Sequence, residues 1–306
     1  MNEILDKYSI SIHKISKYLN YSIIEDYQNK KYLIKIKDSN LDKIFSYLKE
    51  MDYPYYVPFL NDKNDSYQIY PYYEDHIYDN SYKGKEIINA ICDLELKSME
   101  YHDYSLEQLK EYYDQKVKEL DDLMNYYLSL QETIENSNSF SPSSYFLLLH
   151  ISEFYHNIRF SRYELERWYS FEEKRMRTSY LIGDVSFSNF RIGDKKYFID
   201  YKNYKRDFFL EDIISFYRKE GLLIDMISLF DLYQSKISLT RSEKSFFFFR
   251  LLIPNKVSIH DNSYSDCIKI RREIDFMNKS REFYLKENKE DEETNQKEFK
   301  QENEDI

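Results

Sequence analysis

The stretch YLIGDVSFSNFRIGDKKYFIDY at residues 180–201 is the part of the chain that decides its fold. It contains two short apolar segments of the kind found in strands, which flank a loop at 183–189. The pair Gly193-Asp194 predicts a tight turn further along. We therefore expect a small hairpin here, although the segments on both sides have helical patterns.

Three polar side chains of this stretch have the spacing of a phosphate-transfer site. Asp184 is followed five residues later by Asn189, and Asp200 ends the next short strand. An acid can orient or deprotonate a substrate hydroxyl, and an amide oxygen with a second carboxylate offers hard ligands for Mg²⁺. We predict Asp184 as the catalytic residue and Asn189 and Asp200 as metal ligands. The alternative is turn chemistry, since Asp and Asn also bond their own backbone in loops.

The same residues resemble the aminoglycoside phosphotransferase and choline kinase-like superfamily. That family has a catalytic loop H-G-D-x-x-x-x-N and a metal-binding strand that ends in I-D. The positions that match are Gly183, Asp184, Asn189, Ile199 and Asp200. Downstream, RDFFLEDI at 206–213 resembles the family's P-x-x-D-L stretch, and this makes Asp212 a structural aspartate.

The resemblance implies an α+β, two-lobed protein-kinase-like fold. Residues 1–78 would form a small N-terminal lobe, an antiparallel sheet plus one helix. Residues 79–285 would form a larger, mostly helical C-terminal lobe with the catalytic-loop hairpin at 181–200. The remaining segment, 286–306, holds four Lys and nine Asp or Glu and predicts a disordered acidic tail.

The N-terminal pattern agrees with such a lobe. Residues 20–38 predict two strands around a polar turn, and 40–51 predict a helix with Asn40 as its N-cap. A further strand and an extended connector follow the prolines at 54 and 58. By the resemblance, Lys35 in the segment KYLIKI lies where the family places its nucleotide-binding lysine, so Lys35 would contact the phosphates of ATP.

Three departures from the family pattern bear on activity. Ile182 stands where the family has a histidine that braces the catalytic loop. The first glycine is Gly84, so the N-terminal sheet has no glycine-rich loop whose backbone amides could hold phosphates. Glu50 is the only glutamate of the first predicted helix available to pair with Lys35, and it falls near the helix end.

Two functions of different classes therefore stay open. The first is an ATP- and Mg²⁺-dependent phosphotransferase that acts on a small-molecule hydroxyl, with nucleotide and an unknown acceptor as ligands. The second is a pseudokinase, a catalytically degenerate kinase-like protein that serves in structure or assembly with a protein partner. The segment RLLIPNKV at 250–257, followed by a charged helical pattern, resembles the spore-coat-associated branch of the superfamily.

Composition excludes several other classes. The 306 residues carry a formal net charge of −11, which disfavours nucleic acid and anionic membranes as partners. The apolar runs are too short to span a bilayer, and the N-terminus lacks the apolar core of a signal peptide. Two cysteines far apart do not suggest disulfides. The expected location is cytoplasmic, or the spore coat for the second function.

Overall fold

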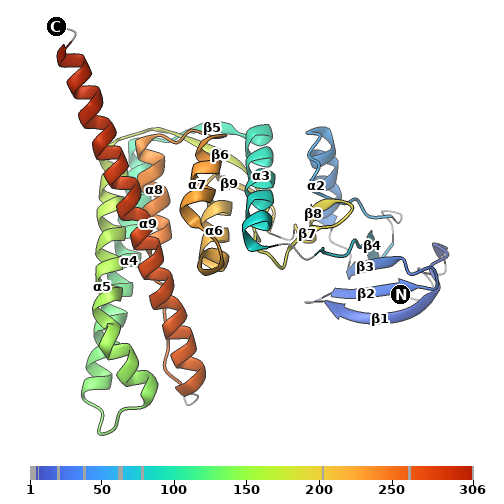
Figure 1. Cartoon of the computed structure of the whole chain (residues 1–306), viewed down its shortest axis with the longest axis horizontal. Coiled ribbons are helices and arrows are strands. Elements are labelled where there is room, and N and C mark those ends of the chain that lie inside the picture. Colours follow the sequence, from blue (N-terminus) through green and yellow to red (C-terminus); the bar gives the residue numbers. More distant parts are fainter. Residues whose placement is uncertain are drawn as a thin grey trace. The chain divides into compact units, whose positions relative to one another are not determined.

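The computed structural model describes residues 5, 7–18, 21–36, 39–60, 65–76, 79–201, 203–260 and 263–304 (Figure 1). The chain divides into two compact units, and each is assembled from two separate stretches. Unit 1 comprises Met1–Glu100 with Arg177–Phe216, and unit 2 comprises Tyr101–Met176 with Tyr217–Ile306. Every residue proposed above for the site belongs to unit 1.

Unit 1 begins with an antiparallel sheet of four strands in the order β1-β2-β3-β4. These strands are Ile12–Tyr18 (β1), Tyr21–Asp26 (β2), Lys31–Ile36 (β3) and Tyr67–Pro71 (β4). The two strands expected within 20–38 are confirmed as β2 and β3, joined by the polar turn. Strand β1 was not predicted, because its side chains are largely exposed and give little apolar alternation.

The alternation of side chains along β2, β3 and β4 buries both faces of this sheet. Ile24, Ile34 and Ile69 pack on one face in an apolar core with Leu5 and Ile10. On the other face lie Ile23, Leu33 and Lys35, all of them buried. Since Lys35 is flanked by apolar neighbours in the strand, its position is fixed by the same pattern that builds the core.

The remaining elements of unit 1 include the predicted hairpin. Helix α2 (Ser39–Glu50) places Phe45 edge-on to Tyr70 of the sheet, with ring centroids 6.0 Å apart. Strand β6 (Arg175–Leu181) pairs with β9 (Lys205–Phe208). In the sequence between these two strands, β7 (Phe190–Ile192) pairs with β8 (Lys196–Phe198). Helix α3 (Asn80–Ser98) also belongs to unit 1, whereas β5 (Glu100–Asp103) and α6 (Glu211–Glu220) both begin in unit 1 and end in unit 2.

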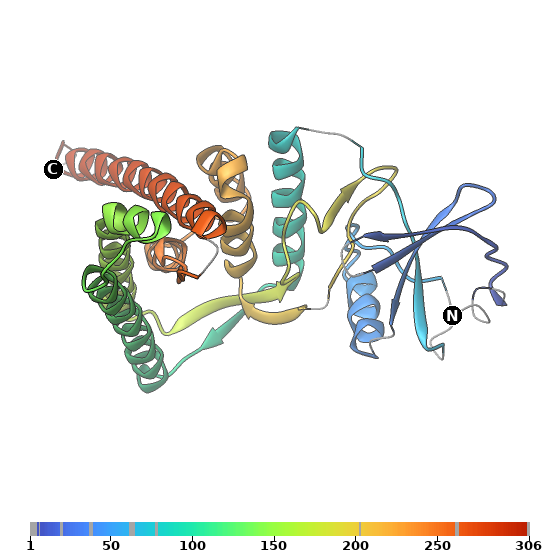
Figure 2. The same ribbon diagram turned by 90° about the horizontal axis from the view of Figure 1, so that it is seen from below.

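Unit 2 is a bundle of helices in which α5 contacts α4, α8 and α9 (Figure 2). Its elements are α4 (Leu106–Glu135), α5 (Pro142–Ser170), the 3₁₀ turn Gly221–Leu223, α7 (Met226–Gln234), α8 (Arg241–Leu252) and α9 (Ser263–Glu304). The four consecutive phenylalanines at 246–249 are all buried, and they form part of the core between the helices.

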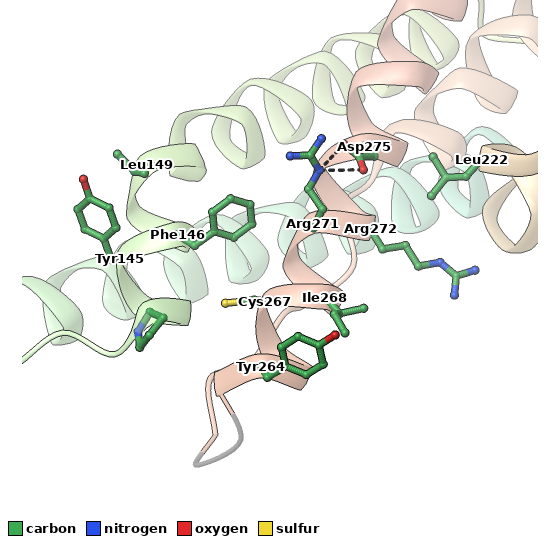
Figure 3. A pocket seen from close by; sticks show the side chains of 11 residues that line it. Tyr145, Phe146, Leu149, Leu222, Tyr264, Cys267, Ile268, Arg271, Arg272 and Asp275 are labelled. Atoms are coloured by element: carbon green, nitrogen blue, oxygen red, sulfur yellow. Dashed lines mark hydrogen bonds and ion pairs between the residues drawn. The ribbon is translucent and has the colours of Figure 1, made fainter.

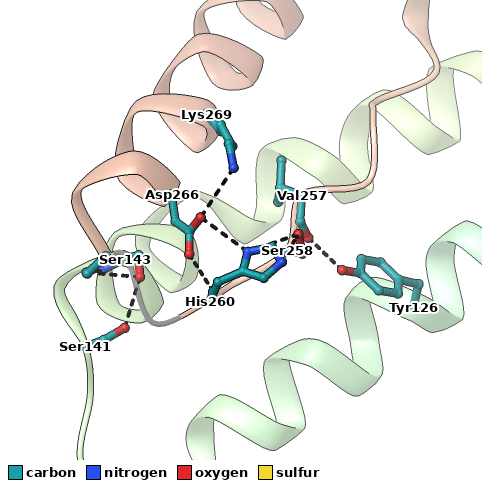
Figure 4. A network of polar contacts seen from close by, with 9 residues as sticks. Tyr126, Ser141, Ser143, Val257, Ser258, His260, Asp266 and Lys269 are labelled. Carbon is teal, nitrogen blue, oxygen red and sulfur yellow. Dashed lines mark hydrogen bonds and ion pairs between the residues drawn. The ribbon is translucent and has the colours of Figure 1, made fainter.

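A polar network fixes the start of α9 within unit 2 (Figure 4). Asp266 is fully buried and accepts a hydrogen bond from the backbone N–H of His260, while Lys269 lies 3.7 Å from its Oδ1. The hydroxyl of Ser263 accepts a hydrogen bond from the N–H of Ser143 at 3.0 Å. The network thus ties α9 to the preceding segment and to the start of α5.

The small antiparallel N-terminal sheet and the mostly helical remainder of the chain confirm the predicted fold class. In the structure, helix α9 continues from residue 286 to Glu304. That this acidic segment forms a disordered tail stays a prediction. Across the described part of the chain, none of the helices is both long enough and apolar enough to cross a membrane.

Candidate active site

The predicted loop and the end of the predicted strand meet in unit 1. Asp184 lies in the loop that leaves β6, Asn189 directly precedes β7, and Asp200 follows β8 two residues after its end. Lys35 reaches the same place from β3. The hairpin therefore brings together the acid, the amide and the second acid, and the sheet adds the lysine.

A buried aspartate holds the first turn of the loop. Asp212, in the first turn of α6, accepts hydrogen bonds from the N–H of Ile182 at 2.7 Å and from the N–H of Gly183 at 2.9 Å. One carboxylate accepts both hydrogen bonds, and the side chain of Asp212 is almost fully buried. This geometry agrees with the structural role expected of Asp212, which is to hold the backbone of the loop. Ile182, which stands where the superfamily pattern has a histidine, is buried.

Replacing Asp212 by Asn is expected to destabilise the protein. One of the two acceptor oxygens becomes an NH₂ donor that faces a backbone N–H, and a buried donor left without a partner costs about 1–3 kcal/mol. The midpoint of thermal unfolding measures this loss. Asp231→Asn, on an exposed position of α7, is the control and should leave the midpoint unchanged. An equal effect of the two substitutions would contradict the role given to Asp212.

Asn189 joins the two acidic segments through its side chain. Its Nδ2 donates to the carbonyl oxygen of Asp184 at 2.6 Å and to that of Asp200 at 3.1 Å. Its Oδ1 accepts from the N–H of Asp200 at 2.8 Å. The buried carboxamide of Asn189 therefore fixes the distance between the loop at Asp184 and the strand end at Asp200. It does so whether or not its Oδ1 also binds a metal ion.

Lys35 is held against the strand end by two acceptors. Its Nζ donates to the carbonyl oxygen of Ile199 and lies 3.5 Å from Oδ1 of Asp200, and its side chain is only 7% exposed. Burial lowers the pKa of the Lys35 ammonium, and the Asp200 carboxylate opposes that shift. Glu50, considered above as a partner for Lys35, ends α2 with an exposed side chain.

Sequence reasoning did not find Tyr21, the first residue of β2. Its phenol donates a hydrogen bond to Oδ2 of Asp200, and Nζ of Lys35 lies 4.5 Å from the centre of its ring. Burial, and then the hydrogen bond to Asp200, raise the pKa of the Tyr21 phenol. The alternation of β2 could have placed Tyr21 on the face that carries Lys35, but no motif marks it.

An apolar pocket of about 760 Å³ lies in unit 2, between the start of α5 and the first turns of α9 (Figure 3). Phe146, Tyr264 and Ile268 line it, and Arg271 on its wall is paired with Asp275. None of the acidic and amide residues discussed above reaches it. We therefore place the candidate site at Asp184 and Asp200 rather than in this pocket.

Within the described ranges, no three or more His, Cys, Asp or Glu side chains gather as a metal site. A cation at the candidate site would thus depend on a mixed set of carboxylate and amide oxygens. Mg²⁺ is commonly held in this way, by one or two carboxylates with the remaining positions filled by phosphate and water.

Comparison with known proteins supports the fold. No protein-family model and no curated sequence matches the chain. An aminoglycoside phosphotransferase from Alicyclobacillus acidocaldarius superposes with a TM-score of 0.73 at 11% identity and covers 96% of each chain. An AMP-bound spectinomycin phosphotransferase superposes with a TM-score of 0.57 at 14% identity, over 91% of this chain and 96% of its own.

At these identities the likeness shows the fold alone, which is the kinase-like fold of the aminoglycoside phosphotransferases. The fold expected from the resemblance is confirmed. Since one fold can carry a working site or only its remains, activity has to be argued from the residues described above.

Proposed function

We propose that the protein is an ATP- and Mg²⁺-dependent phosphotransferase that acts on a hydroxyl group of a small molecule. The observation that carries this proposal is the meeting of Lys35 and Asp200, which are 165 residues apart, beside a loop braced by Asn189. A turn built only for its own stability would not require a buried lysine from a distant strand.

The oxygens present suit the metal. Asp200 offers a carboxylate, and Oδ1 of Asn189 keeps a second lone pair beside the one that accepts the N–H of Asp200. When bound, Mg²⁺ would neutralise charge on the phosphates of ATP. Lys35 would contact the same phosphates after exchanging its present acceptors for phosphate oxygens.

Asp184 would act on the acceptor. Its carboxylate would accept the proton of the substrate hydroxyl while that oxygen forms a bond to the γ-phosphorus of ATP. The bond between the γ-phosphorus and the bridging oxygen breaks, so that the products are a phosphate ester, ADP and the proton held by Asp184. The carbonyl of Asp184 is fixed by Asn189, which keeps the loop in place during this transfer.

Thermal unfolding with and without ligand tests the proposal. A ligand that binds only the native state raises stability by about 2.7 kcal/mol at one hundred times its Kd. ATP with Mg²⁺ is expected to raise the unfolding midpoint of the wild type, and ATP alone is expected to raise it less. Asp200→Asn should lose the metal-dependent part.

The matched control is Asp194→Asn, the same chemical change at an exposed residue of the same hairpin. It should keep the full metal-dependent shift. Absence of any shift in the wild type at millimolar ATP would contradict the proposal.

A second candidate is a kinase-like protein without catalysis that acts in assembly. The hydrogen bond from Tyr21 to Asp200 favours it, because this bond engages an oxygen that a metal would use. The solved structures above lend no support to the spore coat, which rests on the sequence resemblance at 250–257. The same unfolding experiment separates the two candidates, since an assembly protein needs no metal-dependent nucleotide binding.

A further inference from the structure

Tyr21 occupies the place where the functional groups of the site converge. Its hydroxyl is bonded to Oδ2 of Asp200, while Oδ1 of the same carboxylate lies 3.5 Å from Lys35. Its ring lies beside the ammonium of Lys35 at 4.5 Å. Lys35 and Asp200, the predicted metal ligand, are therefore both in contact with one side chain. Tyr21 belongs to none of the sequence motifs that predicted the site.

The backbone of the hairpin keeps Tyr21 at this position. Tyr18 of β1 pairs with Tyr21 of β2, so that only residues 19 and 20, which lie outside the described ranges, connect the two strands. In the next pair, Ser22 lies opposite Ile34, and this register brings Tyr21 next to Lys35 on β3. The start of β2 thus carries an aromatic donor directly over the strand end at Asp200.

We propose that Tyr21 competes with the divalent cation for Asp200 and thereby sets the affinity of the protein for metal-bound nucleotide. This proposal rests on the function proposed above and concerns the same site. A phenol needs an oxygen lone pair as acceptor, and a cation needs the same lone pairs as ligands. The Tyr21 hydroxyl holds one of the lone-pair sites of Oδ2, so a cation that takes this site has to displace the hydroxyl.

The competition depends on the hydroxyl and not on the ring. Tyr21→Phe removes the donor but keeps an aromatic face for the Lys35 ammonium, so the lysine stays in its present surroundings. Lys35 also keeps its hydrogen bond to the carbonyl of Ile199. The substitution therefore removes the bond from Tyr21 to Oδ2 of Asp200 and none of the other contacts described for the site.

The control is Tyr32→Phe in the same sheet. Tyr32 lies on β3, and its hydroxyl also donates to an aspartate, Oδ2 of Asp26, at 3.2 Å. Asp26 lies at the end of β2, beside the polar turn that leads to β3, and is none of the residues assigned to the site. The two substitutions thus remove the same kind of bond, one inside the candidate site and one outside it.

Isothermal titration with Mn²⁺ and the non-hydrolysable analogue AMP-PNP tests the proposal. A hydrogen bond to a charged group is strong enough that its removal should tighten binding about tenfold in Tyr21→Phe. Tyr32→Phe should bind as the wild type does. Without ligand, Tyr21→Phe should unfold at a lower temperature than the wild type, because the bond to Asp200 is lost.

Two other results have separate meanings. Equal or weaker binding by Tyr21→Phe, with binding still abolished in Asp200→Asn, overturns the competition and leaves the phosphotransferase proposal standing. Absence of binding in the wild type and in Tyr21→Phe alike overturns both, since removal of the competitor then reveals no metal site.

Discussion

Asp184→Asn is expected to lower the rate of phosphate transfer by about 10²–10⁴-fold, the usual contribution of a positioned general base. The amide has nearly the volume of the carboxylate but cannot accept the proton of the acceptor hydroxyl at neutral pH. Release of ADP, followed with an acceptor found by screening or with water as the slow acceptor, measures the effect.

Nucleotide binding should separate this effect from a loss of structure. The contacts of Lys35 and the bracing bonds of Asn189 to backbone carbonyls do not involve the carboxylate of Asp184. Affinity for AMP-PNP with Mn²⁺ should therefore stay close to that of the wild type. Asp194→Asn is the control for the chemical change. Unchanged turnover in Asp184→Asn would show that Asp184 is not the base.

Gly183→Ala is expected to give the largest loss of stability. Gly183 has a φ of +80°, and a Cβ placed on it would lie 2.3 Å from the backbone oxygen of Asn203. An unfavourable φ costs about 1–3 kcal/mol, and overpacking against backbone costs a further 1–3 kcal/mol or so. The loop would have to move, and the bond between the N–H of Gly183 and Asp212 would be distorted.

Gly221→Ala is the comparison for this substitution. A Cβ there would come within 3.0 Å of the side chains of Met226 and Phe276, which can shift more easily than backbone. Its unfolding midpoint should therefore fall much less than that of Gly183→Ala. If both fell equally, the special backbone conformation at Gly183 would not be the cause.

The residues of the candidate site that could be predicted from sequence are those that lie together in one short segment. Asp184, Asn189 and Asp200 all lie within a segment of 17 residues. In the structure they come together around the Asn189 carboxamide. The two strands around 20–38 were predictable for the same reason, since their apolar residues alternate and a polar turn separates them.

The parts that were not predictable depend on contacts between distant segments. The contact of Tyr21 with Asp200 joins residues 179 positions apart, and nothing local to Tyr21 marks it. Strand β1 was missed because residues such as Ile15 are exposed. Its sequence therefore gives little of the alternation between apolar and polar residues that marks a half-buried strand.

The interleaving of the two units has a consequence for the order in which the protein is made. Lys35 is synthesised 165 residues before Asp200, and the segment Tyr101–Met176, which belongs to the other unit, is synthesised between them. Because domains fold as units once their parts have emerged, neither unit can be completed from the N-terminal half of the chain alone. A nascent or truncated chain that stops before residue 177 would lack the acceptors that Ile199 and Asp200 offer to Lys35, and it would be a target for proteolysis rather than a smaller working domain.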